Sequence, residues 1–111
     1  MEGIVKFNDW QKLDLRVGKI LSVEDHPNAD KLYIIEVDLK TEKRKLVAGL
    51  KQHYTPKELK GKLCIVVANL EPAVLRGVKS EGMILAAVSE DKTQVKIIRP
   101  DKDIEVGSKI S

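Results

Sequence analysis

The hydrophobic residues of this chain recur with a period of two over several short segments, which is the pattern of half-buried β-strands. In the first segment Leu15 and Val17 alternate with polar residues, and Lys19 and Ile20 break the alternation. Gly18 beside this break predicts a bulge or bend. The expected strands, in chain order, cover residues 15–23, 32–39, 44–50, 62–68, 83–88 and 95–99.

Side-chain parity within these strands predicts core positions. Tyr33, Ile35, Val37 and Leu39 fall on one face of the second strand, so we expect them to be buried. Cys64 is the single cysteine and lies in an apolar run, where a small buried hydrophobic residue is expected. A lone cysteine excludes an internal disulfide bond and a cysteine-based zinc site.

One short helix is expected between the third and fourth strands. Thr55 can cap its N-terminus, and Glu58 three residues later completes a capping box. Pro56 suits the first helical position, and Gly61 can end the helix. The chain is therefore expected to be all-β apart from this helix.

As far as residue 88, the chain has three strands, a short helix and two more strands. This is the order of the OB-fold, a five-stranded barrel that holds ligands on its strand 2–3 face and in its 1–2 and 4–5 loops. The capped helix disfavours an SH3-like barrel. We expect a single domain over residues 1–111, with extra N- and C-terminal elements. The core barrel should cover about residues 14–90 and a C-terminal extension about 91–111. The ligand loops are then residues 24–31 and 69–82.

Positive charge is concentrated in the middle of the chain. Lys and Arg number 20 against 17 Asp and Glu, a formal net charge of +3. Residues 40–62 hold eight basic and two acidic residues, so this segment carries more than the whole excess. Such a basic segment is typical of a protein that binds a polyanion, although lysine-rich surfaces also serve solubility.

Four cations lie near the expected ligand face: Arg16, Lys31, Arg44 and Arg76. Aromatic residues are only 4% of the chain, too few for a surface that stacks successive bases. This scarcity favours recognition of phosphates and of folded RNA shape over recognition of single strands.

No arrangement of residues predicts catalysis, a metal or a cofactor. His26 with Asp25 and Asp30 matches no metal-binding loop and fits a turn equally well. The glycines on either side of Ser80 precede a strand instead of a helix, which excludes a phosphate-binding P-loop. We therefore expect a binding protein and not an enzyme.

Five sequence blocks, in this order, resemble those of one known family. They are residues 14–20 (DLRVGKI), 26–32 (HPNADKL), 47–50 (VAGL), 66–72 (VVANLEP) and 75–87 (LRGVKSEGMILAA). The chain resembles, over about residues 5–111, the tRNA-binding domain found at the C-terminus of methionyl-tRNA synthetases. The same domain occurs as a free-standing dimeric tRNA-binding protein or β subunit.

This resemblance implies tRNA binding that depends on the folded shape of tRNA and raises the tRNA affinity of a synthetase, with methionyl-tRNA synthetase the first candidate. It also implies a homodimer and, as a further partner, the catalytic subunit of that synthetase. The tRNA-facing positions that it implies are Arg16, Asn28, Lys31, Ser80, Glu81 and Met83. Strand position alone leaves Met83 open between core and contact. Arg44 and Arg76 are added from the charge and placement argument.

A peptide-binding export chaperone on the same barrel is the alternative, because a related chaperone is similar in the block at residues 14–18. It would need an apolar cleft near Val74, Leu75 and Met83. Ile97, Ile98 and Ile104 near the C-terminus are candidates for a dimer surface.

The compartment expected from the sequence is the cytoplasm. No stretch approaches the roughly 20 apolar residues that a membrane-spanning helix needs, so no membrane partner is expected. The N-terminal segment has no apolar signal-peptide core.

Overall fold

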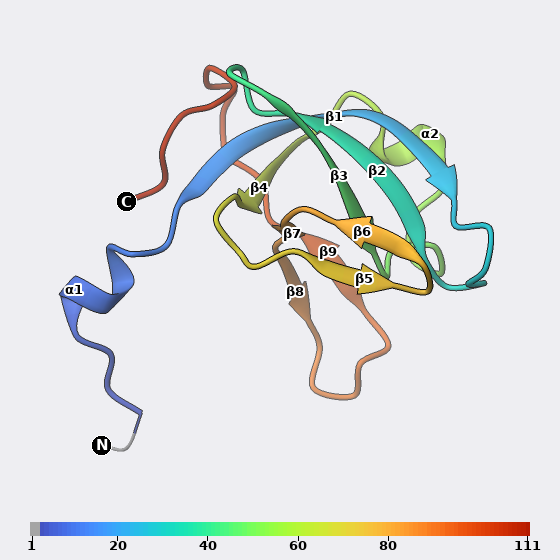
Figure 1. Cartoon of the computed structure of the whole chain (residues 1–111), viewed down its shortest axis with the longest axis horizontal. Coiled ribbons are helices and arrows are strands. Elements are labelled where there is room, and N and C mark those ends of the chain that lie inside the picture. The colour runs from blue at the N-terminus through green and yellow to red at the C-terminus, as the bar shows by residue number, and fades with distance from the viewer. Residues whose placement is uncertain (1–2) are drawn as a thin grey trace.

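A curved antiparallel sheet organises the computed structural model, which describes residues 3–111. Its strands are β1 (Leu15–Asp25), β2 (Tyr33–Asp38), β3 (Lys43–Ala48), β4 (Leu63–Val67) and β7 (Met83–Ile84). They lie in the order β3-β2-β1-β4-β7 (Figure 1). The amide of Glu81, just before β7, donates to the carbonyl of Lys45 in β3 at 2.9 Å, which brings the two edges together. The result is a nearly closed five-stranded barrel, so the predicted all-β OB-like fold is confirmed.

β1 is the longest strand because it serves both sides of the barrel. Residues 15–19 pair with β4, and residues 19–25 pair with β2. The pairing with β2 shifts register between Ile20 and Ser22, so the irregularity lies after Gly18 and not at it. At Gly18 a Cβ atom would lie 3.1 Å from Val66 Cγ2, and the missing side chain lets β1 and β4 pack closely.

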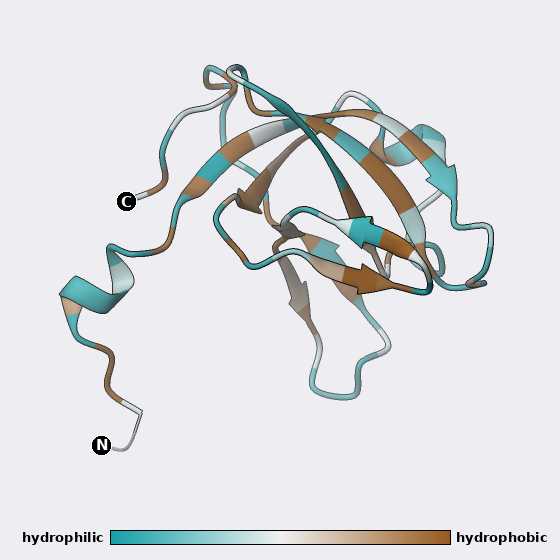
Figure 2. Cartoon of the chain, viewed as in Figure 1, coloured by the Kyte–Doolittle hydropathy of each residue, from teal (hydrophilic) through white to brown (hydrophobic). Residues whose placement is uncertain are grey.

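The barrel interior holds the main hydrophobic core. Tyr33, Ile35, Val37 and Leu39 are all buried there, as side-chain parity predicts, and Cys64 is fully buried. Figure 2 shows β4 as almost entirely hydrophobic, as expected of a strand buried on both faces. A second, smaller cluster covers the other side of β1 and β4: Leu15, Val17, Ile65 and Val67.

The helix α2 (Pro56–Leu59) forms where the capping box predicts it. Thr55 Oγ1 accepts from the Glu58 amide at 3.2 Å, and Glu58 Oε1 accepts from the Thr55 amide at 2.8 Å. Leu59 is fully buried in the interior core, so the helix closes one end of the barrel.

Two hairpins depart from the sequence-based prediction. The expected loop 69–82 contains β5 (Ala73–Leu75) and β6 (Val78–Ser80), which pair with each other. The expected strand 83–88 is divided at Leu85, because residues after it form β8 (Ala86–Val88) and pair with β9 (Val95–Ile97) instead of β4. Periodicity finds strands but does not identify their partners.

Both chain ends add elements to the barrel. The helix α1 (Phe7–Trp10) has no buried residue and stands away from the sheet at the N-terminal end of the chain (Figure 1). The C-terminal tail runs along the first half of β1, where Val17 donates to Ser108 O and Ile110 donates to Leu15 O, each at 2.9 Å. Ile97 is buried in the interior core, so of the three expected dimer-surface residues only Ile98 and Ile104 are exposed.

Gly82→Ala tests the closure of the barrel. Gly82 has φ +146°, and an added Cβ would lie 2.9 Å from Val67 O. Gly61 also has a positive φ, +88°, but an added Cβ there would meet nothing within 4 Å, so Gly61→Ala is the matched control. We expect Gly61→Ala to lower the free energy of unfolding by about 1 kcal/mol and Gly82→Ala by about 3 kcal/mol, because only the second adds a backbone clash to the conformational cost. Urea denaturation measures both, and equal losses would contradict the prediction.

Candidate nucleic-acid interface

Three segments far apart in sequence meet on one face of the barrel. They are the β1–β2 loop (residues 26–32), β3, and the β5–β6 hairpin. His26 Nε2 lies 2.9 Å from the carbonyl oxygen of Leu75, which joins the loop to the hairpin. The Val47 amide donates to Ser80 Oγ at 2.9 Å, which joins β3 to the base of the same hairpin. We call this surface the loop face.

The β5–β6 hairpin presents Arg76 at its tip. Leu75 pairs with Val78, so Arg76 and Gly77 form a two-residue turn. Both have positive φ, 53° and 86°, as in a type I′ turn. Arginine is an unfavourable residue in this conformation, and such residues cluster at functional sites.

A hollow of about 350 Å³ lies between the hairpin tip and the β1–β2 loop. It is lined by Ala29, Asp30, Lys31, Leu32 and Arg76, and we call it the cation hollow. Lys31 and Arg76 are exposed, and within residues 3–111 neither takes part in an ion pair. Two cations from different loops therefore face one open space, and among the described residues Asp30 is the one acidic residue in its lining.

A second hollow, of about 180 Å³, lies between the hairpin and the edge of the barrel. Its lining is mostly apolar, and we call it the apolar hollow; it consists of Val47, Leu70, Glu71, Ala73, Leu75, Ser80, Gly82 and Met83. Met83 is 44% exposed and Leu75 is 39% exposed. Met83 is thus a partly exposed wall of this hollow and not a core residue.

Ser80 and Glu81 contribute to the loop face mainly through internal bonds. Ser80 is buried, and its hydroxyl accepts from Val47 and donates to the Gly82 carbonyl at 3.1 Å. The Glu81 amide donates to Lys45, and its carbonyl accepts from Arg44 at 3.3 Å. Asn28, by contrast, is exposed in the β1–β2 loop.

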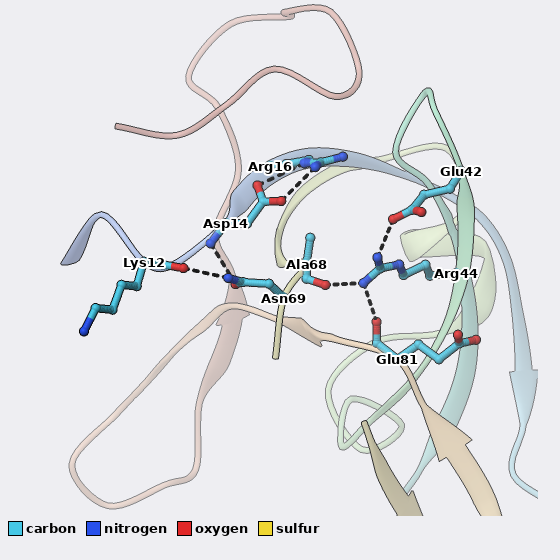
Figure 3. A network of polar contacts seen from close by, with 8 residues as sticks. All are labelled: Lys12, Asp14, Arg16, Glu42, Arg44, Ala68, Asn69 and Glu81. Atoms are coloured by element: carbon cyan, nitrogen blue, oxygen red, sulfur yellow. Dashed lines mark hydrogen bonds and ion pairs between the residues drawn. The ribbon is translucent and has the colours of Figure 1, made fainter. Parts of the chain in front are cut away.

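Arg44 lies at the point where the barrel closes. Its guanidinium donates to the carbonyls of Ala68 and Glu81 and pairs with Glu42 (Figure 3). Arg44, which the charge argument adds to the expected ligand face, is therefore held by three internal partners. Of its neighbours on β3, Lys43 stands opposite Asp38 and Lys45 opposite Glu36, so acidic residues accompany part of the basic segment.

Arg16 is also engaged within the protein. It forms two hydrogen bonds with Asp14, from Nε at 3.0 Å and from a terminal nitrogen at 2.7 Å (Figure 3). These bonds lower the pKa of Asp14 below its ordinary value of 3.8 and raise the pKa of Arg16. Asn69 accepts from the Asp14 amide and donates to the Lys12 carbonyl, so this cluster ties the N-terminal segment to the start of the 4–5 loop.

His26 is the residue of the loop face that sequence reasoning missed. The sequence suggests only a metal ligand or part of a turn, whereas the structure shows a buried side chain bonded at both ring nitrogens. The block at residues 26–32 contains His26, but its partner Leu75 lies 49 residues away.

Among residues 3–111 no group of three or more His, Cys, Asp and Glu side chains could hold a metal ion. None of the helices in this part of the chain is long and apolar enough to span a membrane.

The fold and this face define an OB-like barrel with two cations between its β1–β2 loop and its β5–β6 hairpin. Residues 15–109 match the family model described as "Putative tRNA binding domain". The chain belongs to this family of tRNA-binding domains.

Similar proteins agree with this assignment. The chain is 60% identical over 106 residues to a methionine–tRNA ligase of Pyrococcus horikoshii, and the match covers 96% of this chain but only 14% of the ligase. A MetRS-related protein of P. horikoshii has a similar structure, with a TM-score of 0.92, 32% identity and full coverage of both chains. The CsaA chaperone of Picrophilus torridus also superimposes, with a TM-score of 0.87, 32% identity, and coverage of 97% of this chain and 100% of that one.

Arg44→Met tests whether Arg44 serves the fold. We expect the free energy of unfolding to fall by about 2 kcal/mol, because two carbonyls and Glu42 lose a charged donor. Lys45→Met, at the next and exposed position, is the control and should change stability by less than about 0.5 kcal/mol. Thermal and urea unfolding measure both variants. A stable Arg44→Met protein with weakened tRNA binding would instead assign Arg44 to the RNA surface.

Proposed function

We propose that this chain is a non-catalytic tRNA-binding module that acts in the cytoplasm and raises the tRNA affinity of an aminoacyl-tRNA synthetase. Methionyl-tRNA synthetase is the first candidate for this synthetase. The carrying observation is the cation hollow, where Lys31 and Arg76 face one space on the loop face of a tRNA-binding domain. The similarity to a short part of a methionine–tRNA ligase supports the choice of synthetase.

Phosphate contacts supply most of the binding in this proposal. Tyr33 is buried, and the partly buried Tyr54 packs against the interior core, where its hydroxyl oxygen accepts from the Ile97 amide at 3.1 Å.

 Without a stacking platform on the loop face, the module contacts the backbone and the shape of a folded RNA, and binding releases counterions.

The mechanism is tethering and not chemistry. A weak, general tRNA contact added to the specific contacts of a synthetase raises the overall affinity through effective concentration. The tRNA-facing set comprises two groups: exposed residues that touch RNA directly, and residues that shape the face from within. The first group is Asn28, Lys31, Arg76 and Met83, and the second is Arg16, Arg44, Ser80 and Glu81.

We also propose that two copies of the chain associate through the N-terminal segment. Ile4, Val5 and Phe7 are 74%, 67% and 69% exposed, and Phe7, Trp10 and Leu13 line one hollow together with Ile110. We call these exposed apolar residues of the N-terminal segment the apolar strip. A four-residue helix that buries none of its residues is not stable in water by itself, so α1 needs a surface to pack against. A second copy supplies an equal strip, as in a symmetric dimer.

The second candidate function is peptide binding. The apolar hollow, with Leu75 and Met83 partly exposed, fits an apolar side chain, and a CsaA chaperone has a similar structure. Peptide binding through this hollow would persist at high salt, whereas phosphate binding would not.

Lys31→Ala tests the tRNA proposal. Fluorescence anisotropy with unfractionated tRNA across a salt series should show an affinity that falls steeply with salt in the unmodified protein. Lys31→Ala should weaken binding by about 1 kcal/mol and lower the salt slope by about one, because one phosphate contact is lost. Lys102→Ala, at an exposed position in the C-terminal tail, is the control and should leave both unchanged.

Competitors decide what kind of ligand is bound. Duplex RNA and poly-U should displace tRNA poorly if folded shape is recognised. Equal displacement by any polyanion would contradict the proposal. A reduced, carboxymethylated protein serves as an unfolded test ligand. If this chain binds that ligand at high salt and does not bind tRNA, the peptide-binding function is favoured.

Phe7→Asp tests the association of two copies. Sedimentation velocity should show a dimer for the unmodified chain and a monomer for Phe7→Asp, because a charge in the apolar strip opposes its burial. Val88→Asp, at a position that is 57% exposed on β8, is the control and should remain dimeric. A monomeric unmodified chain would contradict the proposed dimer. A dimeric Phe7→Asp chain together with a monomeric Val88→Asp chain would place the contact between the copies elsewhere on the surface.

A further inference from the structure

His26 connects the two loops of the loop face through both nitrogens of its ring. Its side chain is 5% exposed. The Asn28 amide donates to Nδ1 at 2.9 Å, within the β1–β2 loop. Nε2 lies 2.9 Å from the carbonyl oxygen of Leu75, the last residue of β5. Because Nδ1 accepts a hydrogen bond, the proton of the neutral ring is on Nε2, which donates to Leu75.

The backbone on each side of His26 is restrained by other bonds. The His26 amide donates to the Leu32 carbonyl at 3.1 Å, which closes the β1–β2 loop on itself. On the hairpin side, Leu75 directly precedes the two-residue turn that holds Arg76 at φ 53°. A displacement at Leu75 is therefore passed to Arg76, and a displacement at Asn28 is passed to the segment that carries Lys31.

Lys31 and Arg76 line the cation hollow from these two segments. Each side chain is long and exposed, so its position depends on the backbone that carries it. No backbone hydrogen bond among residues 3–111 joins the β1–β2 loop to the hairpin tip; the His26 side chain makes the bond between them.

We propose that His26 is a positioning residue that fixes the β1–β2 loop against the β5–β6 hairpin, so that Lys31 and Arg76 bind one phosphodiester of the RNA backbone from both sides. This inference rests on the proposed tRNA binding and adds the residue that aligns the two cations. Two cations held at a set distance bind an anion more tightly than two that must first be ordered, because the ordering cost is already met in the free protein. The Asp30 carboxylate lines the same hollow and opposes an anion there.

Three substitutions separate the two bonds of His26. His26→Gln places an amide nitrogen near the position of Nε2 and retains a donor for Leu75. His26→Asn places an amide oxygen near the position of Nδ1 and retains an acceptor for Asn28. His26→Leu removes both bonds and remains apolar at a buried position.

The affinity for unfractionated tRNA should distinguish these variants. We expect His26→Leu and His26→Asn to weaken binding about threefold to tenfold, and His26→Gln to stay within about twofold of the unmodified protein. Thermal unfolding of each variant shows that the compared proteins are folded at the temperature of the titration. Equal affinities for all four proteins would overturn the inference, as would a loss in His26→Gln equal to that in His26→Leu.

A double-mutant cycle with Arg76→Ala separates positioning from a general effect on the fold. If His26 acts by aligning Arg76, His26→Leu should have little further effect once Arg76 is Ala. The same loss of affinity with and without Arg76 would overturn the inference and assign His26 to stability alone. Asp30→Asn should tighten tRNA binding, and an unchanged affinity would remove the phosphate from this hollow.

The unmodified protein distinguishes a failure of this inference from a failure of the proposed function. Salt-sensitive tRNA binding that the His26 variants do not change overturns only the role of His26. An absence of tRNA binding by the unmodified protein overturns both.

Discussion

Closure of the barrel between β3 and the residues just before β7 is the constraint on which the rest of the structure depends. β7 has only two residues, and its ladder with β4 contains only two residue pairs. Further hydrogen bonds join β3 to residues that follow β4 or precede β7. They are formed by the Glu81 amide with Lys45, by the Val47 amide with Ser80, and by Arg44 with Ala68 and Glu81. Without them the sheet would have two unpaired edges and an open interior.

The same contacts position the loop face. Ser80 ends β6, so its bond to β3 fixes the base of the hairpin that carries Arg76 at its tip. His26 then joins that hairpin to the β1–β2 loop. The loop face is thus held at its base by the closing contacts and near its tip by one buried histidine, while Lys31 and Arg76 stay exposed.

Positive residues in this chain divide into two kinds by their surroundings. Arg44 and Arg16 are held by internal acceptors, because a guanidinium presents several donors in a rigid plane and can satisfy carbonyls and carboxylates together. Lys31 and Arg76 have no such partners in the described part of the chain and face open space. Net charge along the sequence does not distinguish these kinds, since the difference depends on neighbours in space.

Local interactions allowed much of the fold to be predicted from the sequence. The buried face of β2 follows from the period of two at Tyr33 and Ile35, and α2 follows from the capping box of Thr55 and Glu58. The sequence by itself also determined the class of barrel and, through its motif blocks, the family. The first two depend on residues only a few positions apart, and the last two depend on the order of such local patterns along the chain.

Only the tertiary structure decided the pairing of β5 with β6, the transfer of residues 86–88 to β9, and the partners of the site residues. Arg44 bonds to a carbonyl 24 residues away, and His26 to one 49 residues away. These acceptors are backbone carbonyls, which every residue carries, so the sequence does not mark which of them a donor will meet. The fold selects them by bringing distant segments within hydrogen-bonding distance, and this is the physical reason that the sequence predicts candidate site residues but not their partners.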